Sequence, residues 1–296
     1  MSQIDLSQLD IFYGDLTANR ALVYARLPRP DDGADWKLTG QIRGPRCRTA
    51  QTLPATSPLV DLGPGPTLLA RALVPEPCFW SPDLPAIYDL TVHLQRGMQV
   101  VATEQRQIGL RSLGVRGRHL ILEGKSLVLR GVATESATSS QPGDWHEAIA
   151  AYVCNDFDLR PLEEASQCGA LGVVMVRQRG ENAISVLRKL SHYPAAAIAV
   201  LDNSLPDGFK KSAVAPNLLL AELRQAGDIA RPSPWADVLV VTVEDPNSIK
   251  SANFRDKPVI AMRRLGAPLD IPAARAACDM LQRDLAPIGL FAGYIV

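Results

Sequence analysis

The chain has 296 residues, which is room for two ordinary domains. Lysine plus arginine equals aspartate plus glutamate at 31 each, so no overall charge favours nucleic acid or an anionic membrane as a partner. No stretch approaches the roughly 18 to 20 apolar residues of a membrane span, and the first residues lack the basic and apolar blocks of a secretory signal. We therefore expect a cytoplasmic protein.

Cysteine and histidine give no sign of a metal site. The five cysteines and four histidines are scattered, without CxxC or HExxH spacing. An odd number of dispersed cysteines is typical of reduced thiols in a cytosolic protein. We expect neither a metal nor a cofactor.

The first part of the chain, to about residue 114, has the pattern of an antiparallel β-sandwich. Short apolar runs alternate with turns rich in proline and glycine. Within residues 88–94 apolar and polar residues alternate, which places one face of a strand on a core. Trp80 is expected to fill the core near the end of the sandwich. The predicted strands are 21–27, 36–42, 57–62, 67–74, 88–94 and 99–110.

After residue 127 the pattern changes to apolar strands alternating with helical stretches, which indicates a parallel sheet. Strands without polar alternation are typical of a barrel wall that is buried on both faces. The predicted strands are 127–133, 151–157, 171–177, 195–201, 217–223, 237–243, 258–263 and 288–296. The predicted helices are 144–150, 161–168, 182–191, 246–253 and 272–285.

Segments between Pro77 and Ser136 resemble a known family. They are Trp-Ser-Pro-x-x-Pro at 80–85, Ile-Gly-Leu-Arg at 108–111, Gly-Lys at 124–125 and Leu-Arg-Gly-Val at 129–132. In this order they resemble glycoside hydrolase family 2, the family of bacterial β-galactosidases and β-glucuronidases. The resemblance implies a multi-domain β plus α/β fold. We expect an immunoglobulin-like β-sandwich at 1–114, followed by a reduced (β/α)8 TIM barrel at 115–296.

The resemblance also implies two catalytic glutamates, after barrel strands four and seven. The segment from residue 194 matches the acid/base segment and puts Asn203 on the family's asparagine and Ser204 on its glutamate. Counting from Lys-Pro at 257–258 puts Arg263 on the nucleophile. A hydroxyl cannot protonate a leaving group at neutral pH, and a guanidinium has no lone pair to offer. We therefore expect no catalytic residue at either family position.

Charged residues follow most of the predicted barrel strands, where sites form in TIM barrels. The simplest interpretation is a rim of solvated ion pairs. If the rim instead carries a site, four carboxylates are candidates to replace the catalytic pair, namely Glu135, Asp202, Glu222 and Glu244. Because arginine binds carboxylates bidentately, the candidate ligand-binding residues are Asn203, Arg177, Arg263 and Arg264. The other charged rim positions are Asp156, Asp158, Arg224 and Asp245.

Three functions stay open on the sequence alone. We favour a catalytically degenerate relative of glycoside hydrolase family 2 that binds a carbohydrate, such as an anionic sugar, or serves as a scaffold. The alternative is a divergent glycosidase that hydrolyses O-glycosyl bonds with rim carboxylates. The third is a structural subunit that pairs with a second copy or with a partner protein.

Overall fold

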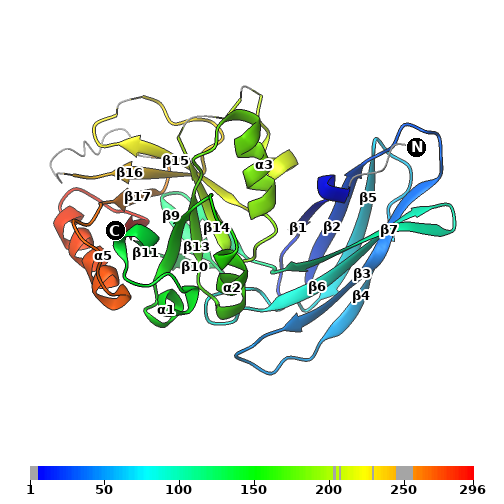
Figure 1. Cartoon of the computed structure of the whole chain (residues 1–296), viewed down its shortest axis with the longest axis horizontal. Helices are drawn as coiled ribbons and strands as arrows, with labels where there is room; N and C mark the ends of the chain where they lie inside the picture. Colours follow the sequence, from blue (N-terminus) through cyan, green and yellow to red (C-terminus); the bar gives the residue numbers. More distant parts are fainter. Residues whose placement is uncertain (1–5, 203–204, 207, 229, 245–255) are drawn as a thin grey trace.

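The structure, a computed structural model, describes residues 6–202, 205–206, 208–228, 230–244 and 256–296. Asn203, Ser204, Asp245 and the predicted helix 246–253 lie outside the described residues. Figure 1 shows two parts, a β-rich N-terminal part and a barrel that contains the C-terminus. Within the described residues, no helix is long and apolar enough to cross a membrane.

The N-terminal part is a β-sandwich-like arrangement of seven antiparallel strands in the order β1-β2-β5-β4-β3-β6-β7. β4 joins the two halves because it pairs with β3 through Leu59 and with β5 at Val60 and Asp61. The six predicted strands are confirmed. The structure adds a seventh, β1, whose short sequence DIFYG was not predicted to form a strand. After the short helix η1 (Leu6–Gln8), the strands are β1 (Asp10–Gly14), β2 (Arg20–Pro28), β3 (Trp36–Arg46), β4 (Ala55–Asp61), β5 (Thr67–Pro75), β6 (Ile87–Arg96) and β7 (Gln99–Ile108).

Alternation along these strands produces the core of the N-terminal part. In β2 the buried positions are every second residue from Ala21 to Leu27, and in β6 they include Leu90, Val92 and Leu94. These side chains share one hydrophobic cluster. Since successive side chains of a strand point to opposite faces, the same alternation leaves the other face to solvent or to a neighbouring element.

A small antiparallel sheet connects the two parts. It comprises β8 (Leu113–Arg116), β9 (His119–Leu122) and β10 (Lys125–Leu127). Its two turns contain Gly117 and Gly124, whose φ angles of 57° and 78° suit glycine better than other residues. Leu120 of β9 is buried in the hydrophobic cluster of the barrel, which ties this sheet to the barrel.

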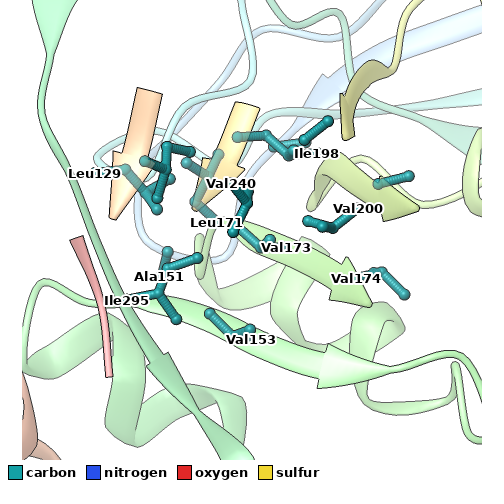
Figure 2. Close-up of a cluster of buried hydrophobic side chains, with 14 of the residues drawn as sticks. Leu129, Ala151, Val153, Leu171, Val173, Val174, Ile198, Val200, Val240 and Ile295 are labelled. Atoms are coloured by element: carbon teal, nitrogen blue, oxygen red, sulfur yellow. The ribbon is translucent and has the colours of Figure 1, made fainter. Parts of the chain in front are cut away.

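The barrel consists of eight parallel strands and is closed, because β18 pairs with both β17 and β11. All eight predicted barrel strands are confirmed, with shifted ends. Valine, isoleucine, leucine and alanine side chains fill the interior, as Figure 2 shows around Val153, Val173 and Ile198. The strands are β11 (Leu129–Ala133), β12 (Ala151–Asn155), β13 (Gly172–Met175), β14 (Ala196–Leu201), β15 (Leu219–Gln225), β16 (Val238–Thr242), β17 (Val259–Met262) and β18 (Gly293–Ile295).

Among the residues that the structure describes, helices cover only part of this barrel. The described residues between β15 and β16 contain no helix, and α4 is a single turn. The sequence predicted helices near α1, α2, α3 and α5, and these four are present. α5 begins where the Asp270 carboxylate accepts a hydrogen bond from Ala273 N at 2.7 Å. The helices are η2 (Thr134–Ser136), α1 (Pro142–Glu147), α2 (Pro161–Cys168), α3 (Gly180–Leu190), α4 (Lys211–Val214) and α5 (Ile271–Leu285).

The N-terminal part is attached to the amino-terminal end of the barrel strands. Trp80 is 0% exposed, and its indole N–H donates to Ser166 O in α2 at 2.9 Å. Arg111 is buried and donates to the carbonyls of Pro194, Ala196 and Asn217, which lie at or just before the starts of β14 and β15. The prediction that Trp80 is a core residue is confirmed. The carboxyl ends of the strands, at the opposite end of the barrel, are therefore clear of this junction.

A half-buried histidine contacts an arginine across the same junction. Arg106 of β7 lies within hydrogen-bond distance of His192 Nε2, and Arg106 Nε pairs with Glu104 at 3.1 Å. Arg106 and His192 line a cavity of about 360 Å³ at this junction, together with Glu163 of α2 and Tyr193. Burial, helped by the Arg106 charge, lowers the pKa of His192 to about 4. A neutral ring is therefore expected here at physiological pH, with Nε2 accepting from the guanidinium.

We expect this histidine to make folding pH-dependent. Its pKa is lower in the folded than in the unfolded chain, so the unfolded chain binds the extra proton between about pH 6.5 and 4. Stability is therefore full above about pH 6.5 and falls by about 2 to 3 kcal/mol towards pH 4.5. Urea unfolding at pH 7.5 and 4.5 measures the change, and His192→Gln is expected to remove most of it. An equal pH dependence in wild type and His192→Gln would contradict the assignment.

Candidate functional site

A cavity of about 880 Å³ opens at the carboxyl ends of the barrel strands. This is the end at which TIM-barrel sites form, and the volume is that of a small-molecule pocket. Apolar side chains such as Val153, Met175 and Leu223 form part of its lining. Its charged lining residues are two carboxylates and three arginines, namely Glu135, Glu244, Arg177, Arg263 and Arg264.

One wall of the cavity is a chain of polar side chains from three neighbouring strand ends. Asn155, the last residue of β12, donates through Nδ2 to Glu135 Oε1 at 2.6 Å. Its Oδ1 accepts from Arg177 Nε at 3.2 Å. Asp156 fixes the backbone beyond β13, since its Oδ2 accepts from the amides of Arg177 and Gln178 at 3.1 and 3.2 Å. Glu135 and Arg177 are thus joined through an amide and not by a direct ion pair.

The opposite wall carries the other two arginines. Arg263 follows β17 directly, and its Nη1 donates to Asp284 of α5 at 2.9 Å. Its Nε is buried and has no hydrogen-bond partner within the described residues. Arg264 and Glu244 are exposed at the cavity rim. These five charged groups of the described lining have a net charge of +1.

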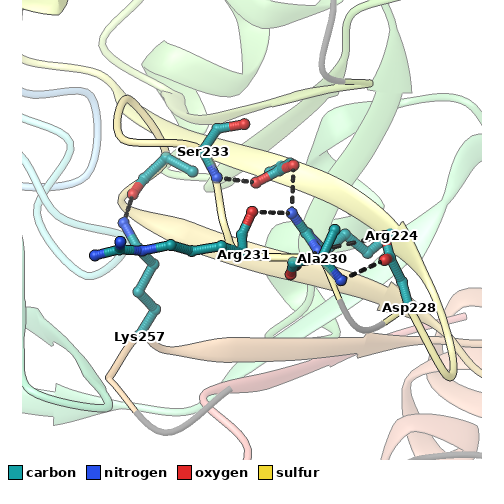
Figure 3. Close-up of polar contacts among 8 residues, drawn as sticks. Arg224, Asp228, Ala230, Arg231, Ser233 and Lys257 are labelled. Carbon is teal, nitrogen blue, oxygen red and sulfur yellow. Dashed lines mark hydrogen bonds and ion pairs between the residues drawn. The ribbon is translucent and has the colours of Figure 1, made fainter. Parts of the chain in front are cut away.

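Glu222 and Arg224 lie outside the cavity, which differs from the sequence expectation. Along β15 it is Leu223 and Gln225 that line the cavity, so the side chains of Glu222 and Arg224 point to the outer surface of the barrel. There they form an ion pair of 2.8 Å beneath the segment that leads to β16. Figure 3 shows Arg224 with its partners in that segment, near Lys257.

The remaining predicted positions are dispersed. Asp202 pairs with Arg179 at 2.8 Å and lines a separate cavity of about 190 Å³, which Arg177 also lines. Asp158 pairs with Arg160, whose side-chain hydrogen bond lowers the pKa of Asp158 to about 2. Both contacts match the interpretation of these charges as ion pairs. Asn203 and Ser204 cannot be placed, because they lie outside the described residues.

The cavity also contains a thiol, that of Cys154 in β12. Burial raises the pKa of Cys154 to about 12, so its reactive thiolate form is scarce at neutral pH. In the part of the chain that the structure describes, no group of three or more histidine, cysteine, aspartate or glutamate side chains could hold a metal ion.

Two residues that shape the cavity were missed from the sequence. Asn155 directly precedes Asp156 at the end of a predicted strand, a position that could have been singled out. Asp284 lies 21 residues after Arg263, on the last helix. A separation of this length gives no indication from the sequence that the two side chains form an ion pair.

Comparison with known proteins shows a similarity in sequence over part of the chain. The family model for glycosyl hydrolases family 2 matches residues 17–111, which run from just before β2 to Arg111. The chain resembles glycosyl hydrolases family 2. Among curated protein sequences, none matches it significantly.

Solved structures related to glycosyl hydrolases family 2 share the fold of nearly the whole chain. Bacteroides uniformis β-glucuronidase 2, covalently bound to cyclophellitol-6-carboxylate aziridine, has 12% identity and a TM-score of 0.62 over 99% of this chain and 46% of its own. A family 2 member from Bacteroides cellulosilyticus has 13% identity and a TM-score of 0.64, over 99% and 45%. A β-glycosidase from Bacteroides vulgatus has 12% and 0.61, over 88% and 38%. The chain thus spans less than half the length of these three proteins, and the likeness concerns the fold.

Proposed function

We propose that the chain is a catalytically degenerate relative of glycosyl hydrolases family 2 that binds a carbohydrate without cleaving it. The observation that carries this proposal is Arg263. It follows β17, where the family resemblance implies the nucleophile, and it is ion-paired with Asp284. A guanidinium stays protonated throughout the useful pH range and cannot attack a sugar. Retaining hydrolysis by the family's route needs a carboxylate at that position.

The ligand we propose is a sugar that carries an acidic group. Three arginines against two carboxylates line the cavity, and arginine binds carboxylates with paired hydrogen bonds. One of the similar structures, a β-glucuronidase, is bound to a compound with a carboxylate, which is a property of that protein. We further propose that the sandwich is immunoglobulin-like and ends at residue 114, and that the barrel is a reduced (β/α)8 barrel. We also propose a cytoplasmic location and a scaffolding contact with a second copy or a partner protein.

A divergent glycosidase is the second candidate, and one observation favours it. Glu135 and Glu244 line the same cavity, so two carboxylates face the space that a sugar would occupy. Of the four carboxylates considered from the sequence, Glu222 and Asp202 are engaged in ion pairs elsewhere. Glu135 and Glu244 are therefore the pair on which this alternative depends.

A turnover assay separates the two functions. We expect the purified protein to release no nitrophenol from a panel of nitrophenyl α- and β-glycosides, nitrophenyl glucuronide included. Calorimetry with sodium glucuronate is expected to show binding, weaker in Arg177→Met. Turnover that disappears in both Glu135→Gln and Glu244→Gln, but persists in the exposed control Glu181→Gln, would establish the glycosidase and refute the degenerate relative.

A further inference from the structure

The polar chain from Glu135 through Asn155 to Arg177 has an arrangement that a simple ion pair lacks. Its three residues come from the ends of β11, β12 and β13 and all line the cavity. The two hydrogen bonds measure 2.6 Å at the glutamate and 3.2 Å at the arginine. The amide separates the two charges, so neither charged group uses its full hydrogen-bonding capacity on the other.

Asparagine is suited to this place because its side chain both donates and accepts. Its NH₂ group meets a carboxylate oxygen and its carbonyl oxygen meets an N–H of the guanidinium. The opposite orientation of the amide would set donor against donor and acceptor against acceptor. Alanine supplies neither contact, and aspartate supplies only the acceptor. The contacts thus fix the orientation of Asn155 and, through it, of its two neighbours.

Arg177 is held on one edge and open on the other. Its backbone amide is bound by Asp156 and its Nε by Asn155. Its Nη1 and Nη2 have no hydrogen-bond partner among the residues that the structure describes. Those two groups form a planar edge with parallel N–H donors, the geometry that grips a carboxylate bidentately.

We infer that Asn155 is a positioning residue, which holds Arg177 and Glu135 as a donor–acceptor pair for a sugar carboxylate and a neighbouring hydroxyl. The carboxylate is bound by the Nη1 and Nη2 edge of Arg177, and the hydroxyl donates to Glu135. The inference rests on the proposed function, because it assumes that a sugar enters the cavity. It assigns the recognition of the acidic group to the β12–β13 wall and not to Arg263 or Arg264.

Calorimetry with three probes tests the binding role. The probes are sodium glucuronate, glucose 6-phosphate and glucose. We expect wild type to prefer glucuronate, and Asn155→Ala to weaken glucuronate binding about tenfold, as one lost charge-assisted hydrogen bond implies, while glucose binding changes little. Asn182→Ala, an exposed asparagine on α3, is the matched control and is expected to bind like wild type. A preference for glucose 6-phosphate would refute the carboxylate, and equal glucuronate binding in Asn155→Ala would refute the positioning role.

A measurement without ligand keeps the two proposals apart. Nitrogen-15 NMR detects exchange of the Arg177 Nε–H with water, which a hydrogen bond slows. We expect slow exchange in wild type and in Asn155→Asp, whose carboxylate still accepts this proton, and fast exchange in Asn155→Ala. If no sugar binds wild type while Asn155→Ala accelerates exchange, the proposed function fails and the positioning of Arg177 stands. If exchange is the same in wild type and Asn155→Ala, the positioning role is refuted whatever binds.

Discussion

Replacing Glu222 by alanine is expected to lower the free energy of unfolding by about 3 to 5 kcal/mol. Glu222 and Arg224 are only 3% and 4% exposed, and their ion pair measures 2.8 Å. The second carboxylate oxygen of Glu222 accepts from Ser233 N at 2.8 Å. Alanine would leave the buried Arg224 guanidinium with only the more exposed Asp228, 3.3 Å away, as a carboxylate partner, and breaking a buried pair by removing one partner is costly.

The effect should be large because this pair stands where other parts of the barrel have a helix. Arg224 also donates to the carbonyls of Ala230 and Arg231 at 2.7 and 3.0 Å. These bonds tie the segment before β16 to the barrel wall, and Figure 3 shows how they converge on one guanidinium. Here polar contacts attach the covering segment to the barrel wall, whereas α2 and α5 are attached by their buried apolar side chains.

Urea unfolding followed by circular dichroism measures the loss. Glu181→Ala, an exposed glutamate on α3, is the matched control and is expected to change stability by less than about 0.5 kcal/mol. The double variant Glu222→Leu with Arg224→Met removes both charges together and is expected to be far less destabilised than Glu222→Ala. A double variant as unstable as the single one would contradict the explanation. Glu222→Gln is for the same reason unsuitable as a test of catalysis, because it too removes the buried carboxylate of Arg224 and leaves only the partly exposed Asp228 as a charged partner.

The barrel strands were predictable from the sequence where burial on both faces makes a strand apolar throughout. Runs such as 196–201 and 238–242 are apolar at nearly every position, since both faces of the wall are covered. Strand ends were harder, as β18 shows: it begins at Gly293, whereas the apolar run begins at Ile288. Apolar character continues into the turn after α5, and periodicity cannot separate the two.

The candidate site was predictable in part. The sequence predicts that charged residues directly after barrel strands face the mouth, and Glu135, Glu244 and the three arginines do line the cavity. The prediction failed for Glu222 because the face on which a side chain lies depends on the parity of its position, and Leu223 and Gln225 occupy the inward positions. It also failed for Asp284, since a contact between a strand end and a later helix depends on the packed structure. Residue type indicates what a side chain can do, but packing decides what it faces.

Replacing Trp80 by alanine is expected to lower the free energy of unfolding by about 3 to 5 kcal/mol. The indole is fully buried between the two parts of the chain and belongs to the hydrophobic cluster of the barrel. Its N–H satisfies Ser166 O at 2.9 Å, and the Arg111 guanidinium carbon lies 5.9 Å from the ring centre. Alanine would leave a cavity and an unpaired carbonyl beside a buried cation.

The same substitution decides whether Trp80 packs the junction or stacks on a sugar. Trp80→Phe retains most of the ring and loses the hydrogen bond, so a smaller loss of about 1 to 3 kcal/mol is expected. Trp235→Ala, at a half-buried tryptophan elsewhere in the barrel, should cost less than Trp80→Ala. Because Trp80 lies at the end of the barrel opposite the cavity, the folded fraction of Trp80→Ala should bind glucuronate as wild type does. Stability near that of wild type together with lost sugar binding would instead make the indole a ligand-stacking surface, which its complete burial argues against.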